Sequence, residues 1–235
     1  MTRRLEERIR TVRAVIFDLD DTLVESTVDF TKFKRLVIER IASYGEDEKD
    51  YGLGETIVAI INRFEERMTK KGVPEKEIRR RLAELDKIMD SVEMERVSQT
   101  VAYDGAARLL GLLRKNGIKV GILTRGCKEY ADSALARTKL AALVDQVECR
   151  NSETKAKPNP EAYLKLVSTL GVRKDETIFV GDHPIDGQCA ANAGVPFIGV
   201  LTGDVTEDAL RRAGSVEVFP DVGRLADWLD GRLET

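Results

Sequence analysis

From Val101 onward, short apolar runs alternate with longer amphipathic segments, and this alternation constrains the fold more than any other feature of the chain. Such a pattern is typical of βα units, in which parallel strands form one Rossmann-like sheet with helices on both faces. The predicted strands are Lys119 to Leu123, Val144 to Cys149, Thr177 to Val180, Phe197 to Leu201 and Val216 to Phe219. The predicted helices are Gly105 to Asn116, Glu129 to Ala141, Pro160 to Leu170, Ile185 to Ala193, Glu207 to Ala213 and Val222 to Leu229.

A first strand is predicted near the start of the chain, where the apolar run Ala14 to Phe17 precedes Asp18-Leu19-Asp20-Asp21-Thr22-Leu23. Side chains two residues apart leave a strand on the same face. Open α/β sheets bind their ligands at the carboxyl ends of the strands. We therefore expect Asp18 and Asp20 to meet one substrate atom from the same side, an arrangement that suits phosphoryl transfer. The alternative is a strand that runs into an acidic, solvated turn.

This hexapeptide resembles the first motif of the haloacid dehalogenase (HAD) superfamily. The resemblance implies that Asp18 is a nucleophile, that Asp20 is a general acid and base, and that Thr22 fixes the turn. Dehalogenation itself is not expected, because Asp20 would have no use in that reaction.

A second motif ends the predicted strand at Leu123, followed by Thr124, Arg125 and Gly126. A hydroxyl and the backbone N–H groups after it can hold phosphate oxygens. Position and residue type resemble the second motif of the superfamily, in which Asn is the commonest residue after the Thr. Arg125 departs from that pattern, so Thr124 and Arg125 are both candidate substrate-binding residues.

The third motif is a lysine in Lys155-Ala156-Lys157-Pro158-Asn159-Pro160, just before a predicted helix. The two prolines stiffen the approach to the helix. By resemblance, Lys157 neutralises charge on the nucleophile and on the phosphoryl group. The alternative is an ordinary solvated lysine.

The fourth motif combines a predicted strand that ends at Val180 with Gly181, Asp182 and Asp186. Asp186 is expected about one turn into the next helix, which returns it toward Asp182 in a supporting role. The side chains of Asp18 and Asp182, together with the backbone carbonyl of Asp20, would supply oxygen ligands of the kind that Mg²⁺ accepts. Mg²⁺ is therefore the expected cofactor.

Residues 26–99 read as successive amphipathic helices, with a glycine-punctuated polar loop from Gly45 to Gly54. We predict a discontinuous catalytic core of residues 1–25 and 100–235 with an inserted all-α cap of residues 26–99. In the cap, Arg63 and Arg67 lie one helical turn apart and could bind a substrate carboxylate, although solvated surface charges are the more ordinary interpretation. Tyr51 and Leu53 are candidates for reading the leaving group.

The composition places further bounds on function. Lys and Arg number 38 against 41 Asp and Glu, which gives a net charge of -3, so no general attraction to nucleic acid or anionic membranes is expected. We find neither an apolar stretch of membrane-spanning length nor a signal peptide, and a cytoplasmic location is expected. The oligomeric state is not predicted.

Together, the four motifs predict a Mg²⁺-dependent phosphatase that hydrolyses a small phosphorylated metabolite through an aspartyl phosphate. The layout resembles the phosphoglycolate phosphatase and β-phosphoglucomutase branch, and 2-phosphoglycolate is the lead candidate substrate. Two alternatives remain. One is a phosphomutase that returns the phosphoryl group to a bound sugar, and the other is a non-catalytic binding protein on the same fold.

Overall fold

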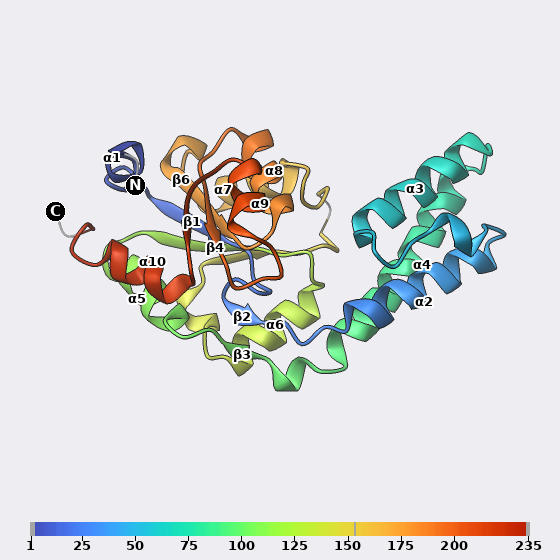
Figure 1. Cartoon of the computed structure of the whole chain (residues 1–235), viewed down its shortest axis with the longest axis horizontal. Coiled ribbons are helices and arrows are strands. Elements are labelled where there is room, and N and C mark those ends of the chain that lie inside the picture. Colours follow the sequence, from blue (N-terminus) through green and yellow to red (C-terminus); the bar gives the residue numbers. More distant parts are fainter. Residues whose placement is uncertain (1–2, 153, 234–235) are drawn as a thin grey trace. The chain divides into compact units, whose positions relative to one another are not determined.

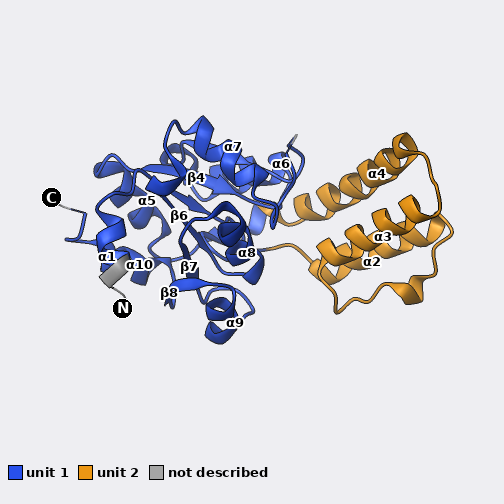
Figure 2. Ribbon diagram, turned by 90° about the horizontal axis from the view of Figure 1, so that it is seen from above, with its two compact units in different colours: residues 1–26, 98–235 blue, residues 27–97 orange. Residues whose placement is uncertain are grey.

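The structure is a computed structural model that describes residues 3–152 and 154–233. The chain divides into two compact units, shown in Figure 2. Unit 1 comprises Met1–Ser26 and Ser98–Thr235, and unit 2 comprises Thr27–Val97. The assignment of residues 1–25 and 100–235 to a catalytic core and of residues 26–99 to a cap stays a prediction.

Unit 1 contains a six-stranded parallel sheet in the order β5-β4-β1-β6-β7-β8. The strands are β1 (Ala14–Phe17), β4 (Lys119–Leu123), β5 (Gln146–Glu148), β6 (Thr177–Gly181), β7 (Phe197–Val200) and β8 (Ser215–Phe219). Every residue of β1 and β6 is buried. Strands covered on both faces are apolar throughout, and for that reason the strands could be recognised as continuous apolar runs.

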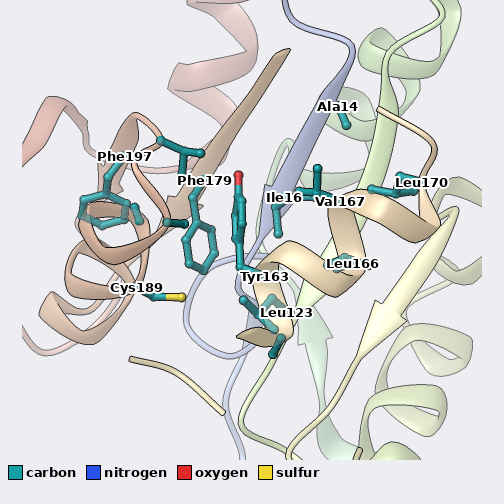
Figure 3. Packing of buried hydrophobic residues seen from close by; sticks show 14 of the residues in the cluster. Ala14, Ile16, Leu123, Tyr163, Leu166, Val167, Leu170, Phe179, Cys189 and Phe197 are labelled. Atoms are coloured by element: carbon teal, nitrogen blue, oxygen red, sulfur yellow. The ribbon is translucent and has the colours of Figure 1, made fainter. Parts of the chain in front are cut away.

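The sheet is covered by helices on both faces (Figure 1). They are α1 (Arg3–Ile9), α5 (Ala106–Lys115), α6 (Lys128–Arg137), α7 (Glu161–Thr169), α8 (Pro184–Ala193), α9 (Glu207–Arg212) and α10 (Val222–Leu229). Helices α7 and α8 pack on one face, where Tyr163 and Leu166 lie beside Ile16 and Phe179 in an apolar cluster (Figure 3). Helices α5 and α10 pack together on the other face. The predicted α/β, Rossmann-like fold class is confirmed.

Some predicted elements end differently in the structure. The predicted helix to Ala141 stops at Arg137 because Lys139 adopts a left-handed conformation with φ 61°, and a separate 3-10 turn, Ala141–Leu143, follows. Two further 3-10 turns are Val97–Gln99 and Lys174–Glu176.

The turn after β1 contains a short strand that the sequence pattern did not predict. Strand β2 (Val24–Glu25) pairs antiparallel with β3 (Val101–Ala102), so two segments separated by unit 2 in the sequence meet in unit 1. Two-residue strands are too short to show an alternating pattern. This two-stranded ribbon lies where the chain leaves unit 1 and returns to it.

Unit 2 consists of α2 (Phe30–Ser43), α3 (Ile57–Lys70) and α4 (Glu75–Met94), with a 3-10 turn at Glu48–Asp50. Asp29 and Thr56 cap the first two helices through their side-chain oxygens. The helices share one apolar core, and residues 27–97, all of which the structure describes, include no strand. Across both units, no helix among the described residues is long and apolar enough to span a membrane.

Candidate active site

The register of the sheet brings three of the predicted site residues to one edge. Phe17 of β1 is paired with Ile122 of β4 and with Val180 of β6, so these strands end at the same level. Asp18, Thr124 and Asp182 follow those strand ends within two residues, and all three side chains are buried. The common edge arises because apolar runs of similar length precede each motif.

Lys157 reaches the same place from the loop before α7. Its side chain is only 2% exposed, and its ammonium group donates to the Asp18 carboxylate and, at 2.7 Å, to Oδ1 of Asp186. Burial opposes a charge on this lysine, but the two carboxylates outweigh that effect and raise its pKa. Lys157 is therefore a buried cation in direct contact with the first Asp of the first motif, and is not the solvated lysine of the alternative interpretation.

Asp182 is held from two sides. The hydroxyl of Thr22 donates to Oδ1 of Asp182 at 2.9 Å. On the other side lies Gly203, where a Cβ atom would come within 2.1 Å of Oδ2. Any side chain at this position would displace the carboxylate. Gly203 follows β7 in a loop, and nothing in the local sequence pattern marks it as part of the site.

Three carboxylates lie close together at this edge of the sheet. Asp18, Asp182 and Asp186 each offer an oxygen, and these oxygens lie within 4.8 Å of one another. Burial raises the pKa of both Asp18 and Asp182, and repulsion from neighbouring carboxylates adds to the rise, while Lys157 opposes it at Asp18. Three buried acids with one buried lysine leave an excess of negative charge. The donor set, made only of oxygens, therefore fits a hard divalent cation such as Mg²⁺.

Asp20 is half-exposed on the turn after β1 and accepts a hydrogen bond from the hydroxyl of Tyr130. Tyr130 is fully buried on α6. Burial, together with the nearby Asp20 carboxylate, raises the pKa of Tyr130 far above its usual value, so the hydroxyl remains a donor. The sequence analysis missed Tyr130, because an aromatic residue on the apolar face of a helix has the pattern of an ordinary core residue.

Residues of the turn after β4 form hydrogen bonds within the turn and to the loop that carries Lys157. The N–H of Gly126 donates to Oγ1 of Thr124 at 2.9 Å, so one of the backbone donors expected to meet phosphate has an internal partner. The guanidinium of Arg125 donates to the backbone carbonyl of Lys157. Arg125 thereby joins the second motif to the loop of the third. A contact between Arg125 and substrate stays a prediction.

His183 forms the N-cap of α8. Its Nδ1 accepts from the N–H of Ile185 at 3.2 Å, and its own N–H donates to Asp186 at 3.1 Å. Burial lowers the pKa of His183; Lys157 and Arg125 lower it further, whereas Asp186 opposes the change. The imidazole thus has a structural task at the start of α8.

In unit 2, the arginines considered for substrate binding are already paired. Arg63 forms an ion pair with Glu55, and Arg67 forms ion pairs with Glu46 and Asp50. Both arginines are partly exposed surface charges that pair within unit 2. Binding of a substrate carboxylate by Arg63 and Arg67 stays a prediction, and it would require these pairs to open.

Tyr51, a candidate for reading the leaving group, is 5% exposed and belongs to the core of unit 2. Its hydroxyl donates to Glu46 at 3.3 Å. Leu53, the second candidate, is 49% exposed. Of these two side chains, Leu53 is therefore the one on the surface.

Comparison with known proteins identifies the class. A family model described as haloacid dehalogenase-like hydrolase matches residues 15–200 of this chain. The chain therefore belongs to the haloacid dehalogenase-like hydrolases, and the predicted family is confirmed.

Two relatives span nearly the whole chain. It is 29% identical over 219 residues to the phosphoglycolate phosphatase of Rhodospirillum rubrum, covering 92% of this chain and 90% of that protein. It is 25% identical to the N-acetylmuramic acid 6-phosphate phosphatase of Pseudomonas aeruginosa, with 94% and 96% covered. These relatives support the predicted enzyme class, a HAD-like phosphatase.

Among solved structures, a hydrolase from Pseudomonas syringae superposes with a TM-score of 0.66 at 23% identity, covering 92% of this chain and 97% of that one. At this level of identity, the similarity supports the fold.

Proposed function

We propose that this protein is a Mg²⁺-dependent phosphatase that hydrolyses a small phosphorylated metabolite through an aspartyl phosphate on Asp18. The observation that carries the proposal is the buried contact between Lys157 and Asp18, within a cluster of three carboxylates at the carboxyl edge of a parallel sheet. A lone acidic turn would have no reason to bury a lysine against its first carboxylate, since burying an ion pair costs desolvation energy.

In the proposed reaction, a carboxylate oxygen of Asp18 attacks phosphorus in line with the leaving oxygen. Asp20, in its acid form, gives its proton to the leaving alkoxide as the P–O bond breaks. Asp20 then takes a proton from water as the water oxygen attacks phosphorus and the bond between phosphorus and Asp18 breaks, which releases phosphate and regenerates the Asp18 carboxylate. Lys157 and Thr124 stabilise the phosphoryl oxygens.

Asp18, Asp182 and the backbone carbonyl of Asp20 are the proposed Mg²⁺ ligands, and Asp186 lies in the same cluster. When bound, Mg²⁺ would offset the negative charge of the acids and of the phosphate dianion. Without such neutralisation, two carboxylates about 4 Å apart repel each other by roughly 4 kcal/mol at an effective dielectric constant of 20.

We propose 2-phosphoglycolate as the first substrate to test. The two relatives described above are named for phosphoglycolate and for N-acetylmuramic acid 6-phosphate, and both compounds contain a carboxylate as well as a phosphate. The residues of the site in unit 1 address the phosphoryl group alone. Unit 2 is therefore proposed to act as the cap that reads the leaving group.

The test is a panel of phosphorylated metabolites assayed with and without Mg²⁺, including 2-phosphoglycolate and an aryl phosphate. We expect phosphate release that requires Mg²⁺ and favours small anionic phosphoesters. Conversion of glucose 1-phosphate to the 6-phosphate faster than phosphate release would instead indicate a mutase. Absence of turnover on every compound would favour a binding protein.

A further inference from the structure

A buried tyrosine hydroxyl contacts the half-exposed carboxylate two residues after the proposed nucleophile. Tyr130, on α6, donates to Oδ1 of Asp20. We propose that Tyr130 is a positioning residue that holds the carboxylate of Asp20 in the orientation needed for proton transfer. This inference rests on the proposed function, in which Asp20 is the general acid and base.

The tyrosine ring is itself held in one orientation. It packs against Gly126, where a Cβ atom would come within 2.8 Å of Cδ1 of the ring. The backbone N–H of Tyr130 donates to Sγ of Cys127 at 3.4 Å, which fixes the first turn of α6. Because the ring is fully buried, its hydroxyl presents a donor at one fixed place.

Asp20 lies in the turn after β1, where its backbone forms a β-bridge to Val24, and its side chain is half-buried. A carboxylate on such a turn would otherwise sample several rotamers. A hydrogen bond from a rigid partner restricts that sampling, and correct orientation of a catalytic group contributes substantially to rate.

The contact also gives the two carboxylate oxygens of Asp20 different roles in the proposal. Oδ1 accepts the tyrosine hydrogen bond, and Oδ2 is proposed to carry the transferred proton. Oδ2 gives this proton to the alkoxide as the ester P–O bond breaks. In the second step Oδ2 receives a proton from water as the new O–P bond forms and the bond between phosphorus and Asp18 breaks. Tyr130 keeps its own proton throughout, so the proton balance involves only Asp20, the leaving group and water.

This role predicts a dependence on the leaving group. Alkoxides are poor leaving groups that need an acid, whereas p-nitrophenolate leaves without one. We expect Tyr130→Phe to lower kcat/KM for 2-phosphoglycolate or sn-glycerol 3-phosphate, whichever the wild-type enzyme hydrolyses faster, by about 10- to 100-fold. The kcat/KM for p-nitrophenyl phosphate should fall by less than about threefold, because kcat/KM reports the steps up to departure of the leaving group.

The matched control is Tyr163→Phe, which removes another fully buried tyrosine hydroxyl, bonded to Oγ1 of Thr177 at 2.8 Å. It should affect both substrates equally or not at all. Tyr130→Phe in the background of Asp20→Asn should cost nothing further on the alkyl phosphate, because the residue that it positions is already lost. Thermal unfolding is measured for every variant, and Tyr130→Met serves as a second variant without the hydroxyl should Tyr130→Phe not fold.

Equal losses on the alkyl and aryl substrates would overturn the proposal and assign Tyr130 a structural role. Wild-type activity of Tyr130→Phe on the alkyl phosphate would overturn it as well. Either result leaves the phosphatase assignment intact, since the wild-type enzyme is active in both cases. If the wild-type enzyme releases no phosphate from any compound, the proposed function fails and the role of Tyr130 fails with it.

Discussion

Thr22 and Asp182 are 160 positions apart in the sequence, yet the hydroxyl of one donates to the carboxylate of the other at 2.9 Å. Both side chains are buried. This hydrogen bond joins the turn after β1 to the end of β6, and it orients an acid that is a proposed metal ligand.

Replacement of Thr22 by Val should therefore weaken both folding and metal binding. Removing a donor from a buried polar partner costs about 1–3 kcal/mol of stability. Thermal unfolding without Mg²⁺ measures the first effect, and calorimetric titration with Mg²⁺ measures the second. Thr169→Val, which alters an exposed threonine on α7, is the control. A Thr22→Val variant that binds Mg²⁺ as tightly as the wild type would contradict the orienting role.

The nucleophile is tested by Asp18→Asn. An amide cannot attack phosphorus, so turnover should fall by orders of magnitude on every substrate, as expected for loss of an essential covalent step. Asp227→Asn changes an exposed aspartate that pairs with Arg108 and should leave the rate unchanged. More than a few per cent of wild-type turnover in a folded Asp18→Asn protein would exclude Asp18 as the nucleophile.

Gly203→Ala should loosen the metal site without touching a ligand directly. The added Cβ would lie 2.1 Å from Oδ2 of Asp182, so the carboxylate must move. Disturbing the groups that orient a metal ligand typically costs 10- to 100-fold in affinity, and we expect about tenfold weaker Mg²⁺ binding. Gly111→Ala on α5 is the control, because beyond the neighbouring residues and the backbone of its own helix no heavy atom lies within 4 Å of the new Cβ. Unchanged Mg²⁺ affinity in Gly203→Ala would count against Asp182 as a ligand.

His183, the single histidine of the chain, gives a direct readout of pH dependence. Burial lowers its pKa, so between that pKa and the ordinary value of about 6.5 the unfolded chain binds more protons than the folded one. The contribution of His183 to stability should consequently decrease as pH falls below about 6.5 and level off once the pH is below the folded pKa. Proton NMR of the imidazole without Mg²⁺ measures the pKa, and a value at or above 6.5 would refute the prediction. His183→Asn, which replaces the capping ring nitrogen with an amide oxygen that can also cap the helix, should lose this part of the pH dependence.

Substitutions of Leu53 and Tyr51 distinguish an effect on substrate selectivity from an effect on the stability of unit 2. Leu53→Ser alters an exposed side chain and, if unit 2 reads the leaving group, should change the ranking of substrates at unchanged thermal stability. Tyr51→Ala removes a core aromatic and should cost about 3–5 kcal/mol instead. An identical ranking for wild type and Leu53→Ser across the phosphoester panel would show that selectivity lies elsewhere.

The inner strands β1, β6 and β7 could be predicted because they are buried along their whole length and appear as apolar runs. The predicted bounds of β4 match the structure. Helix α1 was missed although Leu5 and Ile9, four residues apart, are both buried. The charged residues around them obscured that spacing.

Contacts between distant segments could not be predicted in the same way. Gly203 belongs to the site because the carboxylate of Asp182, from another loop, approaches it closely. Arg67 is paired because Glu46, from the loop between α2 and α3, contacts it. Neither partner lies at a helical or strand spacing, so no local periodicity reveals it.

Asp18, Thr124 and Asp182 were recognisable because each follows an apolar run that ends a strand. Lys157 was recognisable because two prolines follow it before a helix. Residues that orient them, such as Tyr130, look like ordinary packing residues in the sequence.

The split of unit 1 around unit 2 has a consequence for synthesis of the chain on the ribosome. Strand β1 is made first, but its partners β4 and β6 begin at Lys119 and Thr177. Until then an apolar central strand has no neighbour in its sheet, whereas all three helices of unit 2 are already complete. Unit 2 can therefore fold before the sheet forms. Its folding shortens the flexible segment between β1 and β4, and so lowers the entropy cost of pairing these strands. The exposed early strand is the segment that a nascent chain of this protein most needs to have shielded.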